Sequence, residues 1–198
     1  MWIPRASLAR SLERSPGHRP TPGTETPIPR LYLLRHGKSS WDDPALADHD
    51  RPLAPRGRRA AKLIRNHLRE AGIRPELVLC STATRARETL ERVGPGLGDD
   101  AEVRIDAALY TFSATDLLKE LRTVRAGRAS ALVIGHNPAL QELALHVARG
   151  GTHLEALARK YPTAALATLE LSCEWAELGP RTASLVSLVR PKDLPKTD

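Results

Sequence analysis

The chain alternates between short, mostly apolar runs and longer stretches whose apolar positions fall three or four residues apart. A short apolar run bounded by polar residues or glycine predicts a buried strand, whereas the longer spacing predicts a helix with one buried face. Strands are therefore expected at 31–34, 77–80, 102–105, 131–134, 165–171 and 183–189. Helices are expected at 55–71, 82–93, 116–124, 138–149 and 154–160.

Several of these helices have recognisable ends. Pro55 suits the first turn of the first helix, and Gly72 suits its end. The helix at 116–124 has Ser113 or Thr115 as a cap, and Asn137 is expected to cap a helix whose first residue is Pro138.

Regular alternation of strands and helices predicts crossover connections, and hence a mostly parallel sheet with helices on both faces. The expected fold is therefore a three-layer α/β/α sandwich. The last two strands are an exception, because the short link between them, with Gly179-Pro180, favours antiparallel pairing.

The chain of 198 residues is long enough for one domain with terminal extensions. Residues 1–29 are rich in Pro, Ser, Thr and Arg and are expected to be a disordered tail, residues 30–191 the folded domain, and 192–198 a flexible C-terminus. An organelle-targeting segment is the alternative for the tail, but Glu13, Glu25 and the prolines weigh against it.

Several classes of protein are disfavoured by composition. No apolar stretch is long enough to span a membrane, and the N-terminus lacks the apolar middle segment of a secretory signal. Cys80 and Cys173 match no zinc motif and are expected to be buried free thiols, so a cytoplasmic location is expected. The net charge of +7 is concentrated partly in the tail and lacks interleaved aromatic residues, so nucleic acid is not the expected partner.

Candidate chemistry lies in three turns, each directly after a predicted strand. The side chains are Arg35 and His36 in the first turn, Arg85 in the second and His136 in the third. Parallel strands end at one edge of a sheet, so these side chains are expected to converge there. Two guanidinium groups and two imidazoles form a site for an anion, with no metal and no cofactor expected.

The same turns carry the motifs Arg-His-Gly, Ser-x-x-x-Arg-Ala-x-x-Thr and Gly-His-Asn, in this order. Together they resemble the histidine phosphatase superfamily, which includes the cofactor-dependent phosphoglycerate mutases, and in particular its small phosphohistidine phosphatases of the SixA type. The resemblance covers about residues 31 to 189 and implies a phosphoglycerate mutase-like fold. Three further segments add to it: Lys38–Asp42, Asp50–Leu53 and Lys160–Leu166.

This resemblance implies that His36 attacks phosphorus and becomes phosphorylated, while Arg35, Arg85 and His136 hold the phosphoryl oxygens. A nucleophilic imidazole must be neutral and fixed in one tautomer, so its other nitrogen is expected to bond a nearby backbone carbonyl. Ser39 and Asp42, in the loop after the nucleophile, are expected as further substrate contacts, although a carboxylate at Asp42 would repel a phosphate dianion.

An alcohol leaving group needs a general acid, which larger superfamily members carry between the second Arg and the second His. Here Asp106 is the nearest candidate by position, and the stretch Leu109–Ser113 resembles the acid-poor small members. Protein phosphohistidine is therefore the expected substrate, presented by a histidine-containing phosphotransfer type of partner. A small-molecule phosphomonoesterase and a phosphate-binding module without turnover remain the alternatives, and the oligomeric state is undetermined.

The remaining charged and aromatic residues are expected to be structural. Trp41 either flanks the pocket mouth or pins its loop, and His49 is expected to be a surface or packing residue. One further set is expected to form a solvated helix face: Arg56, Arg58, Arg59, Arg65 and Arg69.

Overall fold

A computed structural model describes residues 28–195. The predictions for residues 1–27 and 196–198 lie outside the described residues. The strands are β1 (Arg30–Arg35), β2 (Leu77–Ser81), β3 (Glu102–Asp106), β4 (Ser130–Gly135), β5 (Leu166–Leu171) and β6 (Ala183–Val189). The helices are α1 (Pro55–Glu70), α2 (Thr84–Val93), α3 (Ala114–Arg122), α4 (Ala139–Val147) and α5 (Leu154–Arg159).

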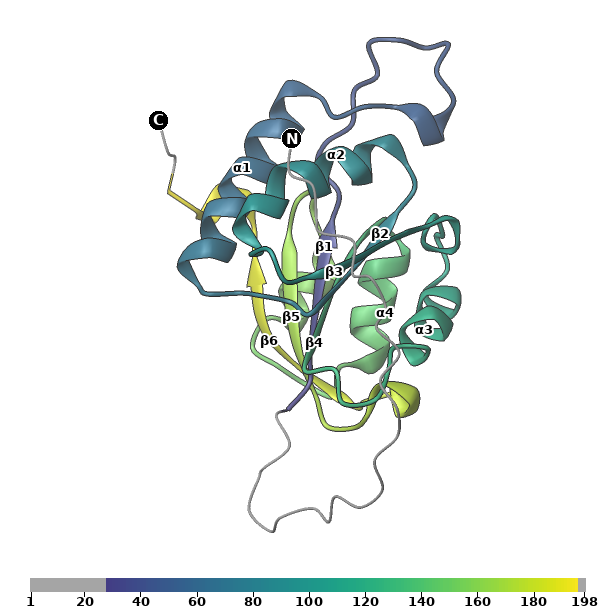
Figure 1. Cartoon of the computed structure of the whole chain (residues 1–198), viewed down its shortest axis with the longest axis vertical. Helices are drawn as coiled ribbons and strands as arrows, with labels where there is room; N and C mark the ends of the chain where they lie inside the picture. The colour runs from purple at the N-terminus through teal and green to yellow at the C-terminus, as the bar shows by residue number, and fades with distance from the viewer. Residues whose placement is uncertain (1–27, 196–198) are drawn as a thin grey trace, which may run out of the picture.

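The six strands form one mixed sheet in the order β3-β2-β4-β1-β5-β6 (Figure 1). The pairs β3–β2, β2–β4 and β4–β1 are parallel, as their crossover connections require. β5 runs antiparallel to both β1 and β6, so the predicted hairpin-like pair is present. Three of the five neighbouring pairs are therefore parallel, and β5 alone runs against the other five strands, so the expectation of a mostly parallel sheet holds in part.

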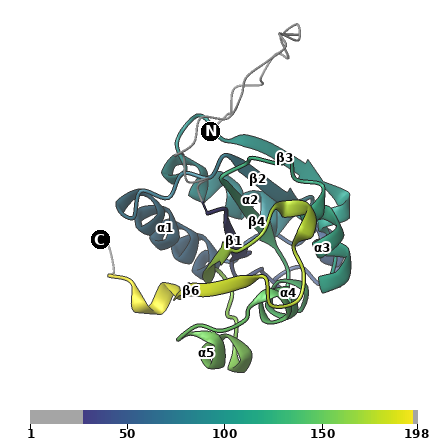
Figure 2. The same cartoon turned by 90° about the horizontal axis from the view of Figure 1, so that it is seen from below.

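Helices lie on both faces of this sheet. Alternate residues of β1 point to opposite faces: Leu31 and Leu33 pack in the cluster with α3, α4 and α5, and Tyr32 and Leu34 in the cluster with α1 and α2. Figure 2 shows the two groups of helices on either side of the strands. Fully burying one such leucine stabilises the fold by about 1.5–3 kcal/mol.

The first helix illustrates how spacing sets packing. Its buried positions are Gly57, Ala61, Ile64 and Leu68, which share one face. Gly57 lies against the loop after β1, since a Cβ there would come within 2.3 Å of the Lys38 carbonyl oxygen. The helix thus holds in place the loop that follows His36.

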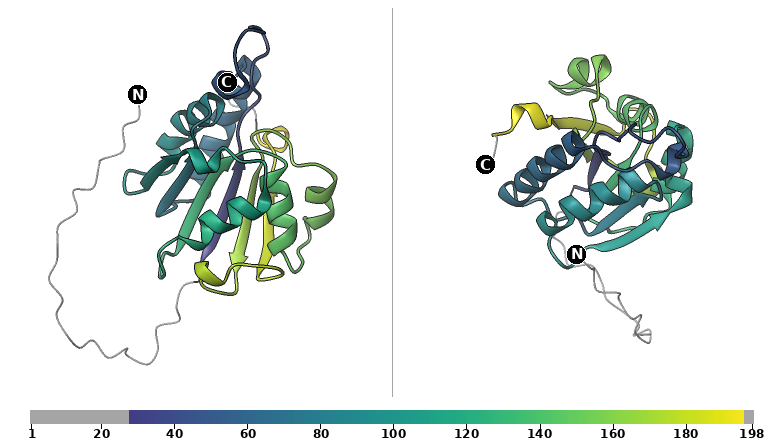
Figure 3. Two further views of the ribbon diagram at one scale, coloured as in Figure 1. Left: turned by 90° about the vertical axis from the view of Figure 1, so that its right-hand side faces the viewer. Right: turned by 90° about the horizontal axis from the view of Figure 1, so that it is seen from above.

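The loop between β1 and α1 rises above the end of the sheet and contains a 3-10 turn, η1, at Asp48–Asp50 (Figures 1 and 3). A bridge between Ser39 and Leu53, near its two ends, closes the base of this loop. The two cysteines are unpaired, as expected; Cys80 is buried as expected, whereas Cys173 is only half-buried.

Candidate active site

Three side chains from three strand ends meet at one edge of the sheet. His36 follows β1, Arg85 lies in the first turn of α2 after β2, and His136 follows β4. Their exposed fractions are 7%, 3% and 2%, and the two imidazole centroids are 5.0 Å apart. Arg85 connects the rings, with Nε 3.4 Å from Nε2 of His36 and Nη2 3.3 Å from Nδ1 of His136. The predicted convergence of these residues is therefore present.

The ring of His36 is fixed in one tautomer. Its Nδ1 lies 2.7 Å from the Gly37 carbonyl oxygen, which only accepts, so Nδ1 carries the proton and Nε2 keeps a lone pair. Burial above all, and then the neighbouring His136, lower the pKa of His36 to about 3, although the bond to Gly37 acts in the opposite direction. The Gly37 amide in turn donates to Thr89 Oγ1 at 3.0 Å. His36 is therefore neutral and oriented at neutral pH.

His136 is neutral for similar reasons. Burial, followed by the charge of Arg85, lowers its pKa to about 4. Because Arg85 donates to Nδ1, the proton lies on Nε2, which is 2.8 Å from Oγ of Ser81. Ser81 is the last residue of β2 and is fully buried. Its hydroxyl is able to accept from or donate to His136, so it supports either tautomer of this ring.

Arg35 is held by the segment before β5. Its Nη1 donates to the Tyr161 carbonyl oxygen at 2.8 Å, and the hydroxyl of Tyr161 donates to the Leu33 carbonyl oxygen. The amide of Ala164 donates to the carbonyl oxygens of Arg35 and His36. The Nε of Arg35 is buried without a hydrogen-bond partner among the described residues, and it is a donor suited to an anion.

Asp48, which the sequence analysis did not identify, forms hydrogen bonds with the cationic side chains of the site. Its Oδ2 accepts from Arg85 Nη2 at 2.8 Å and from Tyr110 Oη at 2.9 Å, and its Oδ1 accepts from Arg51 Nη1 at 3.0 Å. Partial burial acts to raise the pKa of Asp48, but the bond from Tyr110 and the charges of Arg85 and Arg51 outweigh it and lower this pKa. Asp48 is therefore ionised at neutral pH. The sequence signal that could have identified it is its position three residues before Arg51, in a segment of alternating acidic and basic residues.

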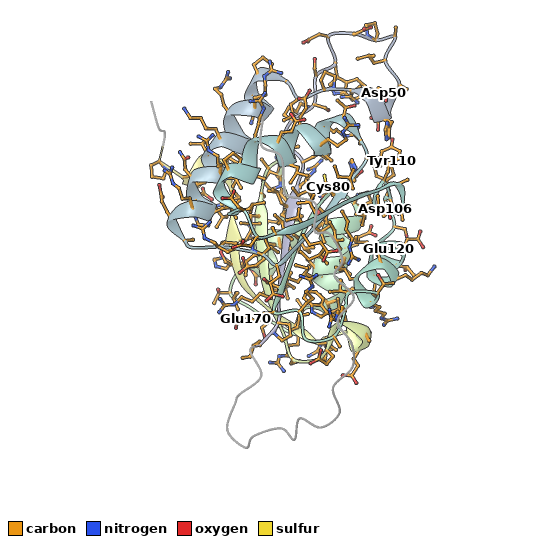
Figure 4. All side chains as sticks on the ribbon, viewed as in Figure 1. Asp50, Cys80, Asp106, Tyr110, Glu120 and Glu170 are labelled. Carbon is orange, nitrogen blue, oxygen red and sulfur yellow. The ribbon has the colours of Figure 1, made fainter. Side chains whose placement is uncertain are left out.

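Two aromatic rings cover His136 on its outer side. The ring centroids of Tyr110 and Phe112 lie 5.3 and 5.6 Å from that of His136. Both come from the acid-poor stretch between β3 and α3. Asp106 instead accepts from the Ala108 amide at 2.8 Å, and Figure 4 shows it further along the same side of the molecule than Tyr110. The nearest ordered carboxylate to the cluster is thus Asp48, not Asp106.

Ser39 and Asp42, the two further substrate contacts expected in the loop after His36, do not reach the cluster. Ser39 is buried and its Oγ accepts from Arg51 Nη2 at 2.7 Å, whereas Asp42 is exposed. Neither side chain is hydrogen-bonded to His36 or Arg85 among the described residues. Trp41 is 70% exposed and stacks on Arg51, so it fixes the loop. His49 lies at the rim, between Thr82 and the ring of Tyr110.

The prediction that Asn137 caps a helix starting at Pro138 is wrong. The helix α4 begins at Ala139 with Pro138 as its cap residue. The Asn137 side chain donates instead to Gln141 Oε1 at 3.0 Å and to the Tyr161 carbonyl oxygen at 3.3 Å. Both bonds use Nδ2, whereas a cap would use Oδ1, and Oδ1 is buried without a hydrogen-bond partner among the described residues. Ser113, in contrast, caps α3 as expected, accepting from the Asp116 amide.

No group of three or more His, Cys, Asp or Glu side chains within residues 28–195 is arranged to hold a metal ion. In the same residues, every helix is too short or too polar to cross a membrane.

Comparison with known proteins agrees with the geometry. The sequence profile of the histidine phosphatase superfamily (branch 1) matches residues 31–117. An uncharacterized protein of Mycobacterium tuberculosis (strain H37Rv) is 39% identical over 163 residues, which are 80% of this chain and 100% of that protein. The phosphohistidine phosphatase SixA of Escherichia coli (strain K12) is 30% identical over 125 residues, 62% of this chain and 76% of that protein.

Solved structures give the same result. A SixA structure from Nakamurella multipartitia superposes with a TM-score of 0.72 at 31% identity, covering 82% of this chain and 96% of that one. The protein histidine phosphatase SixA in complex with tungstate has a TM-score of 0.67 at 25% identity, covering 83% and 98%. With its strand-end His and Arg residues in the expected order and place, this chain belongs to the histidine phosphatase superfamily and is similar to its SixA members.

Proposed function

We propose that this protein is a phosphatase that forms a phosphohistidine on His36 and that its substrate is protein phosphohistidine. The single observation that carries the first part is the state of His36. Its Nε2 bears the lone pair, is held by the bond at Nδ1, and lies 3.4 Å from the Nε of Arg85. A neutral, oriented nucleophile beside permanent cations is the arrangement that phosphoryl transfer requires.

The reaction proceeds in two displacements. Nε2 of His36 forms a bond to phosphorus while the bond to the leaving group breaks, and the leaving atom keeps that electron pair. Arg35 and Arg85 donate to the equatorial oxygens, on which charge is concentrated in the transition state. His136 donates to them in its other tautomer, with the proton on Nδ1 and with Nε2 accepting from the Ser81 hydroxyl. Water then attacks phosphorus, releasing phosphate and returning the electron pair to Nε2.

The acid-poor surroundings support phosphohistidine as the substrate. Asp48 is ionised by its contacts with Arg85 and Tyr110, and Asp106 is engaged with a backbone amide. An alkoxide would therefore leave without a proton donor, whereas the imidazole of phosphohistidine is a better leaving group and takes its proton from water. The similarity to phosphohistidine phosphatase SixA of Escherichia coli supports the same substrate class.

Turnover and the intermediate test the mechanism together. We expect His36→Ala to lower the rate of p-nitrophenyl phosphate hydrolysis by about three orders of magnitude or more. Acid-labile phosphate should be trapped on the wild type and not on the variant. His153→Ala, which lies outside the site, is the matched control. Full turnover by His36→Ala would exclude the mechanism, and binding without turnover by the wild type would favour a phosphate-binding module.

A second experiment tests the substrate. A phosphorylated histidine-containing phosphotransfer domain and a panel of sugar phosphates are compared by kcat/KM under the same conditions. We expect at least a tenfold preference for the phosphorylated domain. A preference for the sugar phosphates would favour the small-molecule phosphomonoesterase instead.

A further inference from the structure

A cavity beside the candidate active site is lined by cations and has no part in the mechanism above. It has a volume of about 470 Å³, within the range of small-molecule sites, which is about 300–1,000 Å³. It lies between the start of α1, the end of α5, the segment before β5 and the 3-10 turn after β6. Figure 3 shows that last segment, in yellow, running beside α1. Its charged lining residues are Lys38, Arg56, Arg159, Lys160, Arg190 and Lys192.

The charge of this cavity is largely uncompensated. None of its lining residues is acidic. Arg190 is paired with Asp193, and Arg159 lies 3.9 Å from Glu155 on the exposed side of α5. The other four cations form no ion pair with any residue from 28 to 195. Four clustered cations without counter-charges repel one another, so the cavity favours a multiply charged anion.

The uncharged residues of the lining indicate the shape and polarity of the rest of that anion. Small apolar surface is supplied by Ala60, Ala156, Pro162 and Pro191. No aromatic ring lines the cavity, so there is no platform on which a nucleobase would stack. We propose that this cavity binds a small molecule carrying two or more phosphate groups, at a site separate from the catalytic one.

The cavity and the catalytic cluster share one wall. Lys160, Pro162 and Thr163 line the cavity, and Tyr161 between them accepts the hydrogen bond of Arg35. Lys38, also in the lining, is two residues beyond His36. The two anion sites are therefore adjacent, and the experiment must separate them.

Tripolyphosphate is the probe, titrated by isothermal calorimetry in 0.15 M KCl. The triple variant Arg56→Gln, Lys160→Gln, Lys192→Gln removes three exposed cavity cations and should raise the Kd at least about tenfold, the combined effect of three modest charge contacts. The control triple Arg59→Gln, Lys62→Gln, Arg87→Gln removes the same charge from exposed positions outside the cavity and should change the Kd less than twofold.

A second arm separates the cavity from the catalytic site. Arg85→Gln, or the wild type saturated with tungstate if that variant does not fold, should keep the tripolyphosphate affinity. Loss of binding in this arm would assign the ligand to the catalytic cluster and overturn the proposal. Equal losses in the two triple variants would do the same, by showing attraction to net charge alone. Tighter binding of an acidic peptide than of tripolyphosphate would reassign the cavity to a protein partner.

Discussion

Acidification should destabilise the protein through His36. In the folded protein, burial and the neighbouring His136 lower the pKa of this ring to about 3, against about 6.5 for a histidine in an unfolded chain. The folded protein therefore excludes a proton that the unfolded chain binds below pH 6.5. Protons favour unfolding throughout this interval, and the loss of stability continues until the pH reaches the folded pKa.

The two pKa values give the size of the effect. At pH 7 the ring is mostly neutral in both states and contributes little. At pH 4.5 it is protonated only in the unfolded chain, which corresponds to a loss of about 2–3 kcal/mol from His36. Replacing this ring should therefore remove its share of the loss in free energy of unfolding between pH 7 and pH 4.5. The share that comes from protonation of carboxylates should remain.

Urea unfolding of the wild type and of His36→Asn, each at pH 7 and pH 4.5, measures the difference. We expect the wild type to lose about 2–3 kcal/mol more than the variant on acidification. His153→Asn, outside the site, should keep the acid sensitivity of the wild type. Equal losses in wild type and His36→Asn would refute a neutral buried imidazole at this position, and with it the argument for its readiness as a nucleophile.

Three further substitutions test the surroundings of the site. Tyr161→Phe leaves the Leu33 carbonyl and the Ala167 amide without their buried partner, so the free energy of unfolding in urea should fall by about 2 kcal/mol, and an unchanged value would contradict this. Gly57→Ala places a Cβ 2.3 Å from the Lys38 carbonyl oxygen and should lower both the midpoint of thermal unfolding and phosphatase activity. Gly150→Ala, with nothing within 4 Å of the added Cβ, serves as its control and should change neither. Ser81→Ala removes the partner of His136 Nε2 and should lower kcat/KM for p-nitrophenyl phosphate about tenfold. The free energy of unfolding in urea should change by no more than about 1 kcal/mol. A loss of stability without a kinetic effect would assign Ser81 a structural role only.

The sequence pattern predicts the framework of the site well, because that framework is set by local features. The apolar run at 131–134 lies within β4, and the spacing of Ala61, Ile64 and Leu68 places one face of α1 against the sheet. Parallel pairing of neighbouring strands then requires that His36 and His136 meet. The adjacency of β1 and β4, which pairs Arg30 with Ser130, is a long-range step that the local pattern does not specify.

The surroundings of the site are less predictable, because they depend on contacts between distant segments. Asp48 meets Tyr110 across 62 positions, and Asn137 meets Tyr161 across 24. Local propensity favours a cap at Asn137, yet its Nδ2 donates to the Tyr161 carbonyl oxygen, a contact that forms only when the segment before β5 lies against this turn. Such competition is decided only when both segments are in place.

Because β5 runs opposite to β1, it meets the sheet edge that carries His36 and His136 in a different way from the parallel strands. The parallel strands reach this edge with their ends, so the segments that follow them supply the reacting groups. β5 reaches it with its beginning, so it is the preceding segment, from Lys160 to Ala165, that closes this side and supports Arg35. A change in the length of that segment would reshape the wall between the two anion sites without moving any strand that carries the nucleophile or the second histidine. At β5, new specificity would therefore arise upstream of the strand rather than downstream of it.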